Sequence, residues 1–406
     1  MKRVALLCMG LAVGAASVAE AQLTMQMSNG WSFTFSGNVN AFAIYESTAD
    51  DGGTLGAPGG LIGIGGKGFN VRTGLLPAFA VLDAKGKEGS TDLGVHFGFA
   101  PQIQCGGQAH DCFGAQIDMR QVFLTVGGTW GQILAGRELG LFGRQNILTD
   151  QTLFGIGATG SAGLPSADVT GGTGGGTTLG RIGFGYNYAQ FKAQMTYSTA
   201  AGRPLQLSIG LFEAASNGPY DKVEIPRLEA EAVWNSENGN TKLWAGGLAQ
   251  TNKSIATDES ASSYGLSGGA KVGGGSFAVV GSGFYGMGIG TTLNFSGGSC
   301  PAPACGANGA DDLRTSYGFI GQATFTPKDS KFTFAASYGS NFLEASDTEG
   351  GSGKIENNLI SGGLYIQSTK SLKVVIEGNY ATGKDDSDAT EDNTSFAPAF
   401  GLMLFF

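Results

Sequence analysis

Residues 31–46 alternate between apolar and polar side chains with a period of two, which predicts an extended strand with two different faces. One face would carry the larger apolar side chains, namely Trp31, Phe33, Phe35, Val39, Ala41, Ala43 and Tyr45. The other face would carry Ser32, Thr34, Ser36, Asn38 and Asn40. A tilted strand needs ~9–11 residues to cross a bilayer, so this stretch is long enough to span one.

The same pattern recurs along the chain, and we count about sixteen strands, an even number as single-chain bacterial barrels require. They are expected near 31–46, 68–82, 91–104, 116–126, 130–137, 181–198, 205–214, 227–234, 241–250, 264–271, 277–288, 315–325, 331–342, 358–366, 372–381 and 395–406. Short turns alternate with longer loops, as in barrels with short periplasmic turns and long external loops. The sequence therefore predicts an all-β, transmembrane antiparallel barrel.

The composition agrees with a wall that contacts lipid. Only 14% of the residues are charged, whereas soluble domains have about 25%. Charged or polar residues interrupt each apolar run after residue 21 well before the length of a spanning helix, which is about 20 residues. The 71 glycines suit tight turns and curved strands. A secreted β-sandwich or β-helix remains an alternative.

The N-terminus has the pattern of a secretory signal peptide. Lys2 and Arg3 precede a short apolar run, and Ala19-Glu20-Ala21 fits an A-x-A cleavage site. We therefore expect residues 1–21 to be removed and residues 22–406 to form a single exported barrel domain.

The stretch from Gln116 to Arg181 holds two predicted strands and a long Gly-rich loop, which is far longer than the two to five residues of a usual hairpin connection. It resembles the trimeric porins of Gram-negative outer membranes, in which an Arg-x-aromatic strand, a Gly-rich turn and a strand ending in Gly-Arg lead into the loop that narrows the pore. The matching residues are Arg120, Phe123, Gly127, Gly128, Gly131, Gly136 and Arg137.

The resemblance implies a homotrimer in the outer membrane, in contact with its lipid and lipopolysaccharide, with the third loop folded into each pore. The terminal Phe406 is similar to the aromatic residue by which such barrels are recognised for assembly. The resemblance also implies an electric field across the constriction, between a basic wall and acidic residues of the loop. The candidate constriction residues are Arg72, Arg120, Arg137, Glu138, Arg144, Asp150, Arg181 and Lys192.

The alternative is that some of these arginines cap strand ends or form structural ion pairs. Alternation around Arg120 is irregular, because Val122, Leu124 and Val126 share its parity. Lys192 and Gln194 lie opposite the apolar face of their strand and are clearer candidates for the lumen. If the arginines face water, an anion preference follows.

Four cysteines follow the signal peptide, as two local pairs in predicted external loops: Cys105 with Cys112, and Cys300 with Cys305. Export leads to an oxidising compartment, so two loop disulfides are expected. A metal site that includes His110 is the alternative.

The function that these features favour is passive diffusion of small hydrophilic solutes and ions through a water-filled channel, with weak preference for anions. A substrate-selective channel for carboxylates, phosphate or sugars, and a surface adhesin or scaffold, are the alternatives. No G-x-S-x-G, H-E-x-x-H or P-loop motif occurs, so we expect no enzyme activity, no cofactor and no nucleic-acid partner.

Overall fold

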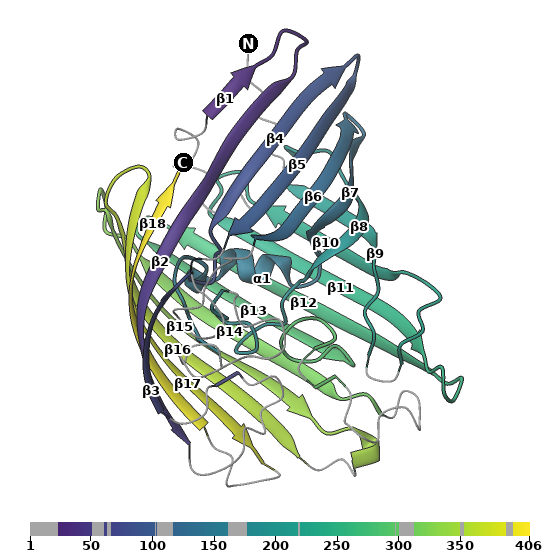
Figure 1. Cartoon of the computed structure of the whole chain (residues 1–406), viewed down its shortest axis with the longest axis vertical. Helices are drawn as coiled ribbons and strands as arrows, with labels where there is room; N and C mark the ends of the chain where they lie inside the picture. The colour runs from purple at the N-terminus through teal and green to yellow at the C-terminus, as the bar shows by residue number, and fades with distance from the viewer. Residues whose placement is uncertain are drawn as a thin grey trace.

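The computed structural model describes residues 23–50, 61–62, 66–101, 103, 117–160, 177–217, 220–296, 298–299, 312–349, 353–386 and 393–406. These residues form one closed antiparallel sheet, a barrel in which each strand lies beside its neighbour in sequence (Figure 1). Among the described residues, no helix is both long enough and apolar enough to cross a membrane.

Eighteen strands are distinguished: β1 (Leu23–Gln26), β2 (Ser32–Asp50), β3 (Gly66–Arg72), β4 (Phe79–Glu88), β5 (Thr91–Pro101), β6 (Ile117–Gly128), β7 (Gly131–Leu139), β8 (Phe191–Ser198), β9 (Leu205–Phe212), β10 (Arg227–Asn235), β11 (Thr241–Lys253), β12 (Ser260–Gly274), β13 (Phe277–Met287), β14 (Thr315–Phe325), β15 (Phe332–Glu344), β16 (Lys354–Gln367), β17 (Leu372–Asp385) and β18 (Asn393–Phe405). Three short helical segments, α1 (Arg144–Thr149), η2 (Gln151–Phe154) and η5 (Asp347–Glu349), accompany them in the described part of the chain.

These strands fill sixteen positions around the barrel. β3 and β4 both pair with β2, one with each half, and therefore act as one interrupted strand. β1 continues the line of β18 along the other edge of β2. The predicted sixteen-stranded antiparallel barrel is confirmed.

The two faces of the wall follow the alternation in the sequence. In β2, Val39 and Tyr45 point outward and are 53% and 42% exposed, whereas Asn38 and Asn40 point into the barrel and are buried. Large apolar side chains are exposed on the outer face of most strands, as a lipid-facing wall requires. Because the barrel closes, it has no free strand edge.

The connections at one end of the barrel, which we call the short-turn end, have two to six residues and include Gly89–Ser90 and Ser236–Asn240. The connections from β7 to β8, from β9 to β10 and from β13 to β14 start at the other end, the long-loop end. The sequence predicted this asymmetry.

The interior of the barrel is largely filled by side chains. A cluster of buried apolar residues joins the wall, represented by Phe42 and Val375, to the segment 140–190, represented by Phe142, Ile156 and Tyr186. The lumen therefore has an apolar core of its own, with the segment 140–190 at its centre.

Two predicted strands are wrong in extent. The strand expected over 68–82 is interrupted between Arg72 and Phe79, where β3 ends and β4 begins. The sequence suggested a strand over 181–198, but β8 begins only at Phe191, and residues 181–190 lie inside the barrel. Gly183, with φ of 80°, interrupts the extended conformation there. The infolded segment is thus longer at its C-terminal end than predicted.

Two glycines test the packing of the lumen. A Cβ on Gly401 would lie 2.2 Å from the ring of the fully buried Phe42, whereas a Cβ on Gly362 of β16 would meet no atom within 4 Å. We expect Gly401→Ala to destabilise the barrel by about 1–3 kcal/mol, because overpacking a filled core forces side chains to shift. Gly362→Ala should change stability by less than about 0.5 kcal/mol. Urea denaturation of the refolded barrel measures both, and equal losses would contradict a packed lumen.

Candidate functional site in the barrel lumen

The infolded segment begins where β7 ends. Gly143, with φ of 80°, reverses the chain and α1 follows at Arg144. Figure 1 shows α1 inside the barrel, at about half its height. A buried segment must satisfy its backbone N–H groups without water, so its hydrogen-bond partners determine where it lies.

Carboxylates of the wall supply those partners at two places, near the start of the segment and at residues 156–157. Glu229 Oε2 on β10 accepts from the backbone N–H groups of Leu141 at 2.7 Å and Phe142 at 2.9 Å. Glu377 Oε1 on β17 accepts from the backbone N–H groups of Ile156 at 3.0 Å and Gly157 at 2.7 Å. Both carboxylates are almost completely buried. They hold the segment to the wall through charge-assisted hydrogen bonds.

Side chains hold α1 in the same way. Glu231 on β10 accepts from Arg144 Nη2 at 2.5 Å and from Gln145 Nε2 at 3.0 Å. Trp244 Nε1 on β11 donates to Asn146 Oδ1 at 2.8 Å. On β14, Gln322 Nε2 donates to the Thr149 carbonyl at 3.1 Å. The helix is therefore attached to β10, β11 and β14.

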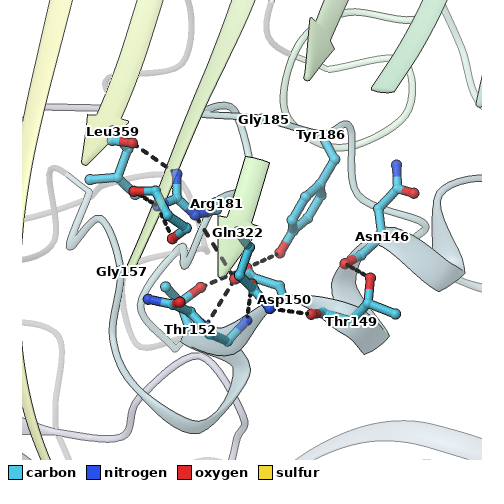
Figure 2. Close-up of polar contacts among 12 residues, drawn as sticks. Asn146, Thr149, Asp150, Thr152, Gly157, Arg181, Gly185, Tyr186, Gln322 and Leu359 are labelled. Atoms are coloured by element: carbon cyan, nitrogen blue, oxygen red, sulfur yellow. Dashed lines mark hydrogen bonds and ion pairs between the residues drawn. The ribbon is translucent and has the colours of Figure 1, made fainter. Parts of the chain in front are cut away.

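Asp150 lies at the centre of the next group of contacts (Figure 2). Its carboxylate accepts from the Thr152 backbone N–H at 2.9 Å and from the Tyr186 hydroxyl at 3.0 Å. Arg181 Nε lies 4.0 Å from Asp150 Oδ1, and the guanidinium donates to the Leu359 carbonyl at 2.9 Å and to Ser337 on the wall. Burial raises the pKa of Asp150, and the charge of Arg181 and the Thr152 hydrogen bond oppose that rise.

The charges are thus mixed on both sides, because the segment carries the acid Asp150 as expected but also two bases, and the wall carries buried acids besides its bases. The wall contributes the acids Glu46, Glu229, Glu231 and Glu377, and the infolded segment contributes the bases Arg144 and Arg181. Of the predicted basic wall, Arg72 is 2% exposed and donates to the Thr177 carbonyl at 3.1 Å. Arg72 and Arg181 therefore stabilise the infolded segment and do not face open water.

Arg137 does not face the lumen. It shares parity with the outward-facing Ile133 on β7 and is exposed on the outer face of the wall, while the neighbouring Glu138 is buried inside. The expectation that Arg137 lines a constriction is wrong, because period-two alternation assigns adjacent residues to opposite faces.

Arg120 faces the lumen because β6 contains a bulge. Gly98 pairs with Gln121 and Phe99 with Met119, so Arg120 has no partner on β5 and the alternation shifts by one residue. Arg120 Nε contacts Asp118 Oδ2 at 2.6 Å, and its guanidinium lies 5.9 Å from the ring centroid of Phe191. It lines a cavity of about 40 Å³ in the lumen. The bulge explains the irregular parity noted in the sequence.

Lys192 lies opposite Glu138 in the pairing of β7 with β8, on the lumen side as predicted. Glu138 accepts from Gln121 Nε2 at 2.9 Å and from the Leu139 backbone N–H at 2.7 Å. Lys192 remains partly exposed. The structure thus brings Arg120, Glu138 and Lys192 together on neighbouring strands.

The infolded segment is attached to one side of the barrel. Among the described residues, no hydrogen bond joins 140–190 to β4, β5 or β6. The lumen-facing residues of β4, which include Val81, Asp83 and Lys85, are half-exposed, whereas Ser337, Leu359 and Glu377 on the opposite wall are buried. The lumen is therefore more open beside β4 than along β14–β17, whereas the lumen-facing His96, Gln121 and Phe123 on β5 and β6 are buried.

Sequence reasoning missed the wall carboxylates. The strand RLEAEAVW places Glu229 and Glu231 at alternate positions on the face opposite Leu228 and Trp234, a signal that alternation could have revealed. Arg227, on the same face, is fully buried, contacts Glu229 Oε1 at 2.9 Å and lies between the rings of Phe212 and Phe295.

The predicted disulfide residues Cys105, Cys112, Cys300 and Cys305, together with His110, lie outside the described residues. At the long-loop end, Arg314 Nε donates to Glu349 Oε2 at 2.9 Å, and the same carboxylate oxygen accepts from the Ser346 backbone N–H at 2.8 Å. The Arg314 hydrogen bond lowers the pKa of Glu349 to about 2.

Comparison with solved structures places this fold among outer-membrane channels. The outer membrane channel DcaP of Acinetobacter baumannii superposes with a TM-score of 0.67 at 14% identity, over 94% of this chain and 99% of that one. An anion-selective porin from Comamonas acidovorans gives 0.63 at 12% identity, over 93% and 100%. The trimer form of OmpT from Vibrio cholerae gives 0.57 at 14% identity, over 93% and 100%. No protein-family model and no curated protein matches the sequence.

Glu377→Ala tests the anchoring of the infolded segment. It removes the acceptor for Ile156 and Gly157, and each buried donor left without a partner costs about 1–3 kcal/mol. We expect faster hydrogen exchange over residues 155–160 and a noisier open-channel current. Glu377→Gln keeps one acceptor oxygen and should be milder, and Glu237→Ala in an exposed turn is the control. Unchanged exchange in Glu377→Ala would contradict the anchor.

The Arg314–Glu349 contact predicts a pH dependence. Because the pKa of Glu349 is depressed in the folded protein, its stabilisation is present above the unfolded pKa of about 4.3 and is lost as the pH falls towards about 2. Hydrogen exchange around Ser346, corrected for its intrinsic pH dependence, should stay slow from pH 7 to pH 5. Glu349→Gln should accelerate it throughout that range. Loss of protection in the wild type above pH 5 would refute the assignment.

Proposed function

We propose that this chain, which has the fold of Gram-negative outer-membrane porins, forms a pore in the outer membrane for passive diffusion of small hydrophilic solutes and ions, with weak preference for anions. The observation that carries the proposal is a closed sixteen-stranded barrel with an apolar outer wall and a charged lumen narrowed by an infolded segment. Such a pore selects by size and by the charges along its path.

The charge balance in the lumen supports the anion preference. Glu229, Glu231 and Glu377 are buried and already accept hydrogen bonds from the infolded segment. Arg120 and Lys192 stay partly exposed, near the open side of the lumen. Asp118, paired with Arg120, and Asp83 are accessible too, so the excess of accessible cations is small, which suits a weak preference.

The proposal includes the remaining features of an exported porin. Residues 1–21 would be removed as a signal peptide, and three copies would associate, by analogy with the trimer form of OmpT. On the outer face, Lys354 lies 4.1 Å from the ring centroid of Phe342 and beside Tyr317, a surface suited to the headgroups of lipid and lipopolysaccharide. The pore would act without covalent chemistry.

The filled lumen favours one other function. If the apolar core around the segment 140–190 seals the barrel, the chain would serve as a surface adhesin or scaffold. A channel selective for carboxylates, phosphate or sugars is a narrower form of the main proposal. A measurement of conductance distinguishes the pore function from the scaffold function.

Bilayer recordings under a salt gradient test both the pore and its selectivity. We expect conductance with a reversal potential that favours chloride. Arg120→Gln should lower the chloride-to-potassium permeability ratio by about twofold, since it removes a lumen cation. Arg137→Gln, the same substitution on the outer face, should leave the ratio unchanged.

An absence of conductance in the wild type would refute the pore and favour the scaffold. Equal effects of the two substitutions would show that Arg120 does not act on the path of the ions.

A further inference from the structure

Two lysines face each other on the lumen side of neighbouring strands. Lys242 on β11 pairs directly with Lys271 on β12. Both point into the barrel, because they share parity with the buried Trp244 and Leu248 on β11 and with Ser267 on β12. They lie close to the short-turn end, since Lys242 is the second residue of β11 and only three residues of β12 follow Lys271.

This arrangement is unfavourable without an additional anion. Directly opposed residues of an antiparallel pair have Cβ atoms ~4.5–5.5 Å apart, and like charges at that separation destabilise the sheet. Elsewhere in this lumen, buried arginines have acidic partners, as in the pairs Arg144–Glu231 and Arg227–Glu229. The lysine pair departs from that pattern.

The groups around the lysines do not neutralise them. Lys242 Nζ donates to Gln145 Oε1 of α1, a neutral acceptor. Glu231 is the nearest acid that acts on Lys242, but its two oxygens already accept from Arg144 and Gln145. Lys271 is exposed, and within the described residues it forms no ion pair and no hydrogen bond. The site keeps a net positive charge.

The surroundings of the two lysines are suited to a solute that has passed the region narrowed by the infolded segment. Val233, Trp244 and Val280 form a buried apolar cluster beside the lysines, which excludes water from one side. Gln145 joins Lys242 to α1, so the pair lies at the edge of the narrowed region, on its short-turn side. Ammonium groups on flexible stems can adjust to one oxyanion between them.

We infer that Lys242 and Lys271 form a binding site for small oxyanions, a phosphate or carboxylate group, through which solutes pass on the short-turn side of the infolded segment. The inference rests on the proposed pore function and narrows its solute class. One oxyanion bridging the two ammonium groups removes their mutual repulsion and occupies the donors of Lys271. A monovalent chloride, with a single charge and no second oxygen, fits the site less well.

Inorganic phosphate is the probe, added at neutral pH on the short-turn side of single channels in potassium chloride. We expect phosphate to reduce the chloride current of the wild type, and the double variant Lys242→Gln/Lys271→Gln to raise the half-blocking concentration at least tenfold. Lys328→Gln, in an exposed turn at the same end, is the matched control and should behave as the wild type. No block in the wild type, or equal block in the double variant, would overturn the inference while the pore function stands.

A second measurement needs no conductance. In detergent, phosphate should raise the unfolding temperature of the folded wild type and of Lys328→Gln, and leave that of Lys271→Gln unchanged. Without phosphate, Lys271→Gln should be at least as stable as the wild type, because it removes a repulsion and no attractive contact. If the wild type does not conduct but phosphate still stabilises it through Lys271, the pore function fails and the oxyanion site remains. If phosphate stabilises Lys271→Gln equally, the site is refuted.

Discussion

Backbone N–H groups that are buried away from water need hydrogen-bond partners within the protein. This requirement shapes both the wall of the barrel and the segment inside it. In the wall, each strand must pair with a neighbour on both sides, and closure of the sheet achieves this with no free edge. Inside the barrel, the infolded segment has the same requirement but no sheet to join. Glu229 accepts hydrogen bonds from the adjacent N–H groups of Leu141 and Phe142, and Glu377 accepts from those of Ile156 and Gly157. The position of the segment follows from where the wall provides carboxylates.

This use of carboxylates changes how the charge of the protein acts on solutes. The formal net charge of -9 would suggest an acidic pore. Yet Glu46, Glu229 and Glu377 are at most 2% exposed, and their oxygens accept from protein donors. Interactions of buried groups with a passing ion are partly cancelled by these local partners. In the proposed pore, the accessible charges, which include Arg120, Asp118 and Lys192, would therefore affect selectivity more than the total charge does.

Alternation predicted the wall well because each strand obeys one rule over many residues. The two faces of β2 and the number of strand positions followed from it directly. The rule failed where a single residue shifts the register, as at the bulge beside Arg120, and where glycines end the regular conformation, as at Gly183. The porin-like pattern suggested Arg137 for the pore, but its parity with Ile133 puts it on the outer face. Alternation marks Glu229 and Glu231 as lumen-facing, but the backbone N–H groups that bind Glu229 and Glu377 leave no mark in the sequence.

The attachment of the infolded segment also bears on where solutes could pass. Its hydrogen bonds reach β2, β3, β10, β11 and β14 to β17, whereas among the described residues none reaches β4, β5 or β6. The side chains of Val81, Asp83 and Lys85 keep partial exposure on that unattached wall. The apolar core on one side and the half-exposed polar groups on the other would direct hydrated solutes past β4 and Arg120. A segment fixed in this way can narrow a pore without closing it. It packs against one set of strands, and the solutes would pass between the segment and other strands.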